Sequence, residues 1–223
     1  TAILNEKDPE NRLYARGPSG RLSAEMIRDL ALASSGLLVD KVGGESVYPY
    51  QPEGIWSMNN KEYKQGVGAK QLYRRSMYTI YKRSVPPPNM TAFDATMRSY
   101  SVGERQETST PLQSLALLND PQIVEATRVL SSNIMKETSD VKSQLTRLYR
   151  RLTSRVPNDR EYVLINDMYV DMVESFTARP TDATDFLSTG EYPVDESLNQ
   201  VKLAALSSVA NILINHDASV IKR

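Results

Sequence analysis

The sequence predicts a mainly α protein, with a helical bundle in its second half and an irregular, loop-rich first half. Nine of its ten glycines fall within residues 1–110, together with proline clusters that favour turns. Residues 111–223 instead carry successive helix caps, followed by apolar side chains spaced three and four residues apart. We therefore expect one domain over residues 1–223, composed of a loop-rich part (1–110) and a helical-bundle part (111–223).

The first helix predicted in the loop-rich part begins directly after Ser23. A serine at the N-cap accepts a hydrogen bond from a first-turn amide, and the residues that follow place Met26, Ile27 and Leu30 on one face. Gly36 is suited to end this helix, because glycine adopts the left-handed conformation at little cost.

Residues 73–84 are ambiguous between helix and strand. Tyr73, Met77 and Tyr81 recur four residues apart, which favours a helix, whereas the Thr-Ile pair within the segment also suits a strand. We predict a helix that ends before Pro86, since a residue that precedes proline avoids helical backbone angles.

The helical-bundle part shows a cap at the start of each expected helix. The first four caps are Thr, Asp or Asn. Three of them are strengthened by a proline at the next position, by a Gln or Glu three residues later, or by both. On the fourth helix we place Leu164, Met168 and Met172 on the apolar face. The predicted starts are Thr110 (with Pro111 and Gln113), Asp120 (with Pro121), Asp140 and Asn158 (with Glu161), and a last helix spans about residues 197–214.

The composition excludes several kinds of chemistry within this stretch. Without cysteine there is no disulfide, thiolate nucleophile, Cys-ligated metal site or covalent haem attachment, and the single histidine, His216, is expected near a helix C-terminus. A formal net charge of 0 argues against binding of nucleic acid through overall charge. No apolar run reaches the about 18 residues that a membrane span requires. We expect no cofactor, no metal, no nucleic-acid partner and no transmembrane segment in this chain.

Residues 70–105 form the most unusual window of the sequence. They combine seven Lys and Arg with two acids, and tyrosines are interleaved with the basic residues. Arginine binds carboxylate, sulfate or phosphate groups through two parallel hydrogen bonds, and aromatic faces stack on sugars. The window therefore predicts a site for an anionic ligand such as an acidic saccharide. Its candidate ligand-binding residues are Arg74, Arg75, Tyr78, Arg83, Asp94, Glu104 and Arg105.

Two other interpretations of this window stay open. In one, the arginines pair with the second part, which has 15 acidic and 12 basic residues, while the tyrosines pack with their hydroxyls at the surface. In the other, Asp94 and Glu104 form a carboxylate pair for glycoside hydrolysis, with Arg74, Arg75 or Arg105 binding the anion.

Several strings, in order along nearly the whole chain, resemble a single family. They are NRLYARGPSGRLSAEMIRD (11–29), GGESVYPYQPEGIW (43–56), YRRSMYTIYKRSVPPPNMTAFDA (73–95), ERQETSTPLQSLALLNDPQ (104–122) and LTRLYRRLTSRVPND (145–159). Together they resemble the planctomycete-type cytochrome-associated C-terminal domain of unknown function. Two features depart from the family pattern, namely a shorter insert over residues 57–70 and Ala218, which stands where an acid is usual.

The resemblance implies a context rather than a reaction. It implies that the chain is a piece of a larger exported bacterial protein, periplasmic or extracellular, although the chain itself carries no export signal. Haem c would belong to upstream modules, and the partners would be the upstream domains of the same protein. The resemblance supplies no catalytic residue.

Two hypotheses for function follow. The first is a non-catalytic helical module of an exported, cytochrome-linked multidomain protein, which binds an anionic glycan or assembles a redox or polysaccharide-processing complex. The second is a carbohydrate-active enzyme that uses Asp94 and Glu104 with an arginine cluster. A structure separates them, because the enzyme requires both acids and at least two of Arg74, Arg75 and Arg105 in a single cleft.

Overall fold

A computed structural model of the chain describes residues 2–17, 19–56 and 62–222, and the fold is mainly α, as predicted. The start of the shortened insert, residues 57–61, lies outside the described residues. The loop-rich part contains α1 (Ala2–Lys7), β1 (Gly20–Arg21), α2 (Ala24–Ser35), α3 (Ala69–Leu72), the 3-10 helix η2 (Ser76–Tyr78) and α4 (Pro88–Thr91). The remainder contains α5 (Pro111–Asn119), α6 (Pro121–Glu137), α7 (Val141–Thr153), α8 (Asp159–Ala178), α9 (Pro180–Leu187), α10 (Gln200–Ile214), α11 (Asp217–Val220) and β2 (Ile221–Lys222).

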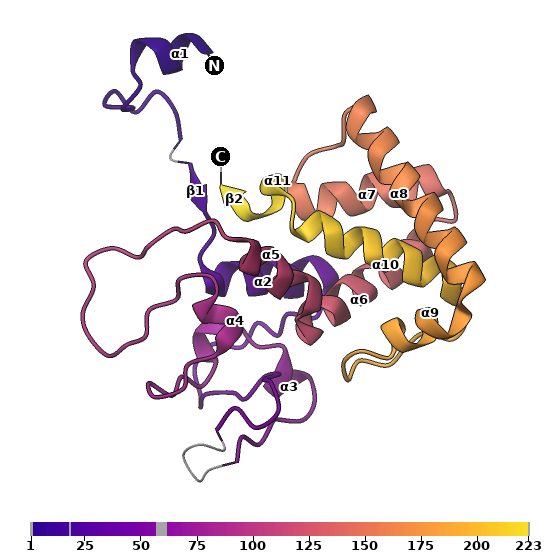
Figure 1. Cartoon of the computed structure of the whole chain (residues 1–223), viewed down its shortest axis with the longest axis horizontal. Coiled ribbons are helices and arrows are strands. Elements are labelled where there is room, and N and C mark those ends of the chain that lie inside the picture. Colours follow the sequence, from indigo (N-terminus) through magenta and orange to yellow (C-terminus); the bar gives the residue numbers. More distant parts are fainter. Residues whose placement is uncertain (1, 18, 57–61, 223) are drawn as a thin grey trace.

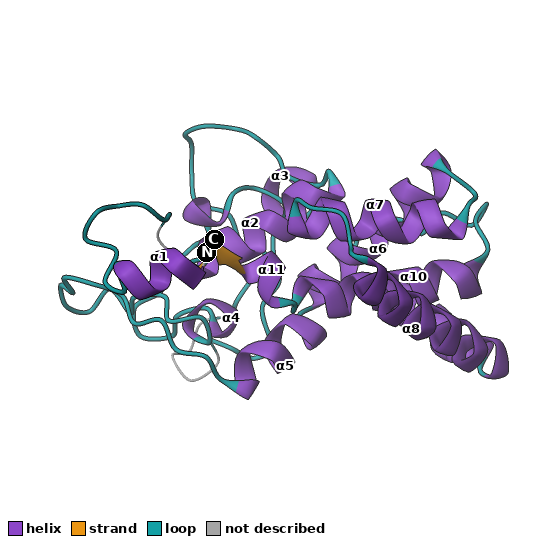
Figure 2. Cartoon of the chain, turned by 90° about the horizontal axis from the view of Figure 1, so that it is seen from above, coloured by secondary structure: helices purple, strands orange, loops and turns teal. Residues whose placement is uncertain are grey.

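The two parts lie side by side and share helix α6. Figure 1 shows the loops and short helices of the first part on one side and α7 to α10 on the other, with α1 standing away from the body. Strand β2 returns to pair antiparallel with β1, which brings the end of the chain to the first part. Figure 2 shows the same arrangement from above, with α7, α8 and α10 toward one end of the molecule and most of the long loops toward the other.

Helix α6 belongs to two hydrophobic clusters. Its Ile123 and Val129 pack with α2 and with residues of the loops in the first part. Its Leu130 and Ile134 pack with α7, α8 and α10 in the second cluster. Because α6 contributes to both clusters, every residue from 122 to 131 is buried, whereas a surface helix buries only one face.

Most of the predicted helix ends are confirmed. The Met26 amide donates to Ser23 Oγ at 3.3 Å, and Gly36 ends α2 with φ of +81°. Asp120 and Asp140 cap α6 and α7 through their carboxylates. The last helix begins at Gln200, about three residues later than predicted, because the Asn199 side chain caps it by accepting from the Lys202 amide. Capping joins residues within three positions of each other and can therefore be predicted from the sequence.

The predicted helix over residues 73–84 is wrong. Only η2 is helical there, and extended backbone flanks it. The Val39 amide donates to the Tyr73 carbonyl at 2.9 Å, and Val47 pairs with Thr79 in a parallel bridge. The backbone of this segment thus makes hydrogen bonds with residues about thirty positions earlier. This tertiary pairing stabilises an extended conformation although the apolar spacing favours a helix.

One further prediction about the second part needs correction. Leu164 is 57% exposed, because the buried face of α8 is centred on Ile165 and Tyr169 instead. The predicted place of His216 near a helix C-terminus is confirmed, because it directly follows Asn215, the C-cap of α10, and its amide donates to the Leu213 carbonyl at 3.0 Å. His216 is also the N-cap of α11, where its Nδ1 accepts a hydrogen bond from the Ala218 amide at 3.1 Å.

The connection between α7 and α8 is closed by an ion pair that responds to acid. Arg155 donates to both carboxylate oxygens of Glu161, at 2.6 and 2.7 Å, and the Asn158 amide donates to the same carboxylate at 2.9 Å. These hydrogen bonds, that from Arg155 foremost, lower the pKa of Glu161 to about 2. A lowered folded-state pKa stabilises the fold above the unfolded-state value and not below the folded one.

We therefore expect Glu161→Gln to be destabilising at neutral pH and to lose its effect in acid. The difference in free energy of unfolding from the wild type should be full above about pH 5 and should vanish as the pH falls toward about 2. Urea unfolding followed by circular dichroism over this pH range measures it. Glu174→Gln is the matched control, because Glu174 is an exposed acid of the same helix without an ion pair in the described part of the chain. An equal pH dependence in both variants would contradict the prediction.

Candidate functional site

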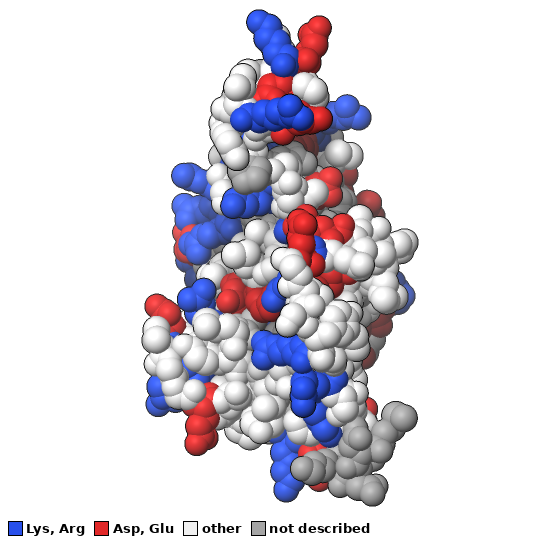
Figure 3. All heavy atoms as spheres, turned by 90° about the vertical axis from the view of Figure 1, so that its left-hand side faces the viewer, with Lys and Arg blue, Asp and Glu red and all other residues white. Residues whose placement is uncertain are grey.

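A large hollow, which we call the polar hollow for the charged residues at its wall, lies between α4 and the loop of residues 94–106. Its volume is about 760 Å³, within the range of small-molecule sites. The loop is the wide turn that leaves the body of the molecule beside α4 in Figure 1. Figure 3 shows this side of the molecule, with basic and acidic side chains interspersed instead of gathered in one basic surface. Of the predicted ligand-binding residues, the hollow is lined by Asp94, Glu104 and Arg105.

Asp94 is fixed at the wall of this hollow by neighbours on both sides. Its carboxylate accepts from Arg21 Nη2 at 2.7 Å and from the Thr108 amide at 2.9 Å, and the Thr108 hydroxyl donates to it as well. The backbone of Asp94 has φ of +59°, a left-handed conformation that short polar side chains tolerate best. The sequence thus supplies an aspartate where the chain must turn, and Arg21 balances its charge.

Arg105 is held in a similar way by a residue of α2. Its two terminal nitrogens donate to the two carboxylate oxygens of Glu25 at 2.7 and 3.0 Å. Burial alone would raise the pKa of Glu25, but the hydrogen bonds and the positive charge of Arg105, together with hydrogen bonds from the backbone and from Ser23, make the net shift of that pKa downward. The same hydrogen bonds raise the pKa of Arg105. This two-bonded ion pair joins the loop of residues 94–106 to α2, and its two charges balance each other at the edge of the hollow.

Arg98 differs from these two ion-paired arginines. Its guanidinium lies over the ring of Tyr81, 4.6 Å from the centroid, and within the described chain it has no carboxylate partner. Tyr100, on the same loop, is 72% exposed. The hollow therefore offers one unpaired cation, one open aromatic face and one acid, Glu104, without an ion-pair partner in the described part of the chain, beside two balanced ion pairs. Sequence reasoning placed Arg98 and Tyr100 in the unusual window but not among the site residues.

Four of the predicted site residues lie outside the hollow. Arg74 is buried, donates to the carbonyls of Lys41, Gly43 and Glu45, and stacks on the Tyr78 ring at 3.8 Å. This pair therefore holds the loop of residues 41–45 in place, which is a structural role. The other two lie on the surface, where Arg75 is 3.6 Å from Asp29 and Arg83 is exposed.

The interpretation in which these arginines pair with the second part is also wrong in its detail. Among the described residues, the ion-pair partners of the arginines in this window are Asp29 and Glu25, both in the first part. The second part is reached by tyrosines instead. The Tyr73 hydroxyl donates to the buried Glu125 carboxylate at 2.9 Å, so it does not lie at the surface.

Glu125 collects hydrogen bonds from three separate segments. It is fully buried on α6, and its Oε1 accepts from the hydroxyls of Tyr50 (3.2 Å) and Tyr73 and from the Tyr192 amide (2.6 Å). Burial and the nearby carboxylate raise the pKa of Tyr50 and of Tyr73. Gly190 packs so closely that a Cβ there would lie 2.4 Å from the carboxylate. We call Glu125, Tyr50, Tyr73 and the amide of Tyr192 the Glu125 cluster.

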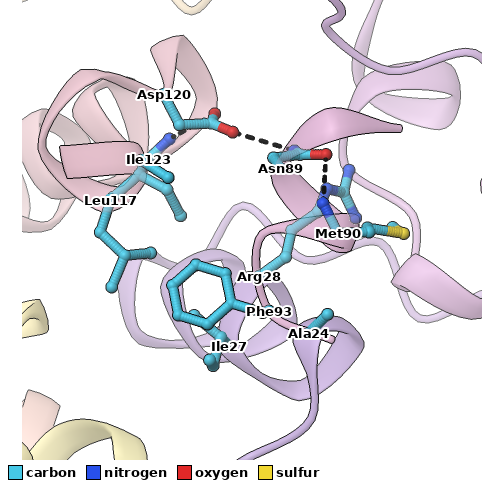
Figure 4. Close-up of a pocket in the computed structure, with 10 residues that line it drawn as sticks. Ala24, Ile27, Arg28, Asn89, Met90, Phe93, Leu117, Asp120 and Ile123 are labelled. Atoms are coloured by element: carbon cyan, nitrogen blue, oxygen red, sulfur yellow. Dashed lines mark hydrogen bonds between the residues drawn. The ribbon is translucent and has the colours of Figure 1, made fainter. Parts of the chain in front are cut away.

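Arg28 is the second buried charge that the sequence did not reveal. Its Nε donates to Gln122 Oε1 at 2.5 Å, and its terminal nitrogens donate to the carbonyls of Leu72 and Arg74 and to the Ser76 hydroxyl. Burial lowers the pKa of Arg28 to about 10. Figure 4 shows it next to Met90, at a cavity of about 20 Å³ whose apolar walls include Phe93, Leu117 and Ile123.

Fold and site together define a mainly α fold in which buried charges join helices to long loops, with a hollow beside α4 on its surface. The family model of PSD1, described as a protein of unknown function (DUF1553), matches residues 1–169, and the chain belongs to this family. No curated protein and no solved structure matches the chain. Among the described helices there is none long and apolar enough to cross a membrane.

Proposed function

We propose that the chain is a non-catalytic binding module and that its hollow binds an acidic saccharide. The observation that carries this proposal is Arg98, which lines the hollow without an ion-pair partner among the described residues. A guanidinium in this state can bind a carboxylate or sulfate group through two hydrogen bonds. The open ring of Tyr100 can pack against the apolar face of a sugar, and Glu104 can accept from sugar hydroxyls.

The non-catalytic assignment rests on how the acids are held. Asp94 accepts hydrogen bonds from Arg21 and Thr108, which supports a role as a fixed acceptor and not as a proton donor. Both acids of the enzyme alternative line the hollow, but of its three arginines only Arg105 does, and that residue is paired with Glu25. The geometry therefore favours binding over hydrolysis.

The biological setting is also part of the proposal. We infer that the module belongs to an exported, cytochrome-linked multidomain protein, periplasmic or extracellular, in which upstream domains carry haem c and are its partners. The support is the series of family strings along residues 11–159, from the NRLYARGPSGR segment to LTSRVPND. Binding of a polysaccharide by this module would place the redox modules close to that polymer.

The test is a comparison of two exposed arginines. We expect Arg98→Ala to weaken binding of trigalacturonate by about tenfold or more, the loss of one charge-assisted hydrogen-bonded contact. Arg83→Ala is the matched control, because Arg83 is exposed on the same part of the chain but does not line the hollow, and it should change the affinity by less than about twofold. Isothermal titration calorimetry measures both, with maltotriose as the uncharged reference ligand.

Three outcomes would contradict the proposal. Equal losses in both variants would indicate general charge attraction, and equal binding of maltotriose would remove the role of the anion. Release of new reducing ends from trigalacturonate, abolished by Asp94→Asn or Glu104→Gln, would instead establish the carbohydrate-active enzyme.

A further inference from the structure

A second depression of different character lies on the other side of α4. We call it the α4–α5 groove; it is open, has a volume of about 470 Å³ and shares only Pro88 with the polar hollow. Its walls come from the loop at residues 50–52, from α4 and from the junction of α5 with α6. The apolar residues that line it are Pro52, Pro88, Ala92, Leu112, Ala116 and Pro121.

The polar groups along the α4–α5 groove are largely occupied by the protein itself. Asp120 is its one charged lining residue, and its Oδ1 accepts from the Gln122 amide while its Oδ2 accepts from Asn89 Nδ2 at 2.9 Å. Asn119 Nδ2 donates to the Leu115 carbonyl at 2.9 Å. The Tyr50 hydroxyl is used in the Glu125 cluster. Gln51 also lines the groove, and its buried Oε1 has no hydrogen-bond partner. A ligand would therefore meet apolar surface, one unpartnered amide oxygen and no free charge.

The apolar surface of the α4–α5 groove is also unusually open to water. Leu112 is 60% exposed at its rim, and Ala116 and Ala92 line it from the adjoining helices. Three prolines restrict the backbone around it, so the groove exists before a ligand arrives and costs little ordering on binding. Removing this apolar surface from water is the available driving force, and it rewards an apolar ligand without charge.

We propose that the α4–α5 groove is a binding site for an uncharged, apolar small molecule. The charge balance excludes an anion as the preferred ligand, because the one charged lining group is a carboxylate. The volume falls within the range of small-molecule sites. The small cavity of Figure 4, which shares Asn89, Ala116 and Asp120 with the groove, is the size of a single water and does not extend the site.

The test uses two dyes with one ring system and one pair of leucines. N-phenyl-1-naphthylamine is uncharged, and 8-anilinonaphthalene-1-sulfonate is the same skeleton with a sulfonate. We expect the uncharged dye to bind saturably with one site per chain, and at least about tenfold more tightly than the sulfonate, because the groove offers the anion no partner. Fluorescence titration of the folded chain measures both affinities.

Leu112→Glu and Leu115→Glu locate the bound dye. Both leucines are more than half exposed on α5, but only Leu112 lines the groove, so both variants should fold alike and only Leu112→Glu should weaken the uncharged dye by about tenfold. Equal weakening by both variants would place the dye on the α5 surface, and no saturable binding would remove the site. Equal affinity for the sulfonate would overturn the assigned ligand class.

Discussion

Replacing Glu125 by leucine is expected to lower the free energy of unfolding by about 3–5 kcal/mol. The side chain is fully buried, so water cannot replace its carboxylate as the hydrogen-bond acceptor. The hydroxyls of Tyr50 and Tyr73 and the amide of Tyr192 would each keep a hydrogen without an acceptor. The methyl groups of leucine supply volume but no acceptor, so the penalty falls on all three segments together.

Glu125→Gln separates this hydrogen-bonding role from simple packing. Glutamine has the same shape and keeps a carbonyl oxygen at the position of Oε1, so it can still accept from the three donors. We expect a loss of about 1–2 kcal/mol, since hydrogen bonds to a neutral acceptor are weaker than those to a carboxylate. Urea denaturation of the three proteins measures the series. Equal losses for leucine and glutamine would show that the carboxylate, and not the acceptor geometry, sets the stability.

The sequence could not indicate that Glu125 is buried. Gln122, Glu125 and Arg128 recur at intervals of three along α6, a spacing typical of a solvated helix face. In the fold, each side chain of this face has partners from other segments. Gln122 bonds the Leu72 carbonyl, and Arg128 donates to the carbonyls of Thr189, Tyr192 and Pro193. Polar spacing reports a helix correctly, but what covers its polar face is decided by loops far away in sequence.

The candidate site was predictable only in the part that is local in sequence. Asp94, Glu104 and Arg105 fall within twelve residues, so a single window of sequence contained the residues that the loop brings to the hollow. Their partners Arg21 and Glu25 come about seventy to eighty positions earlier, and no local pattern connects them. The caps of α2, α6, α7 and α8 were predictable because each is satisfied within three residues of the cap.

Arg28→Met is the second substitution for which we expect a large effect, a loss of about 3–5 kcal/mol in the free energy of unfolding. Replacing a buried ion pair by apolar groups can be harmless when both charged partners are removed together. Arg28 is a different case, because its acceptors include the main-chain carbonyls of Leu72 and Arg74, which no substitution at this position removes. Methionine fills the space of the arginine stem but leaves the buried Arg74 carbonyl without the Arg28 donor. The Leu72 carbonyl loses one of two donors and keeps the one from Gln122 Nε2.

Arg28→Lys tests whether the geometry of the guanidinium matters beyond its charge. Lysine keeps a cation, but its single ammonium cannot reach Gln122, the two carbonyls and the Ser76 hydroxyl in the directions that the planar fork serves. We expect an intermediate loss of about 2–3 kcal/mol, measured by thermal and urea unfolding. Full stability in the lysine variant would mean that charge alone suffices. Full stability in the methionine variant would mean that α2 and the segment of residues 72–76 are joined by apolar packing, and that the buried arginine contributes nothing to the fold.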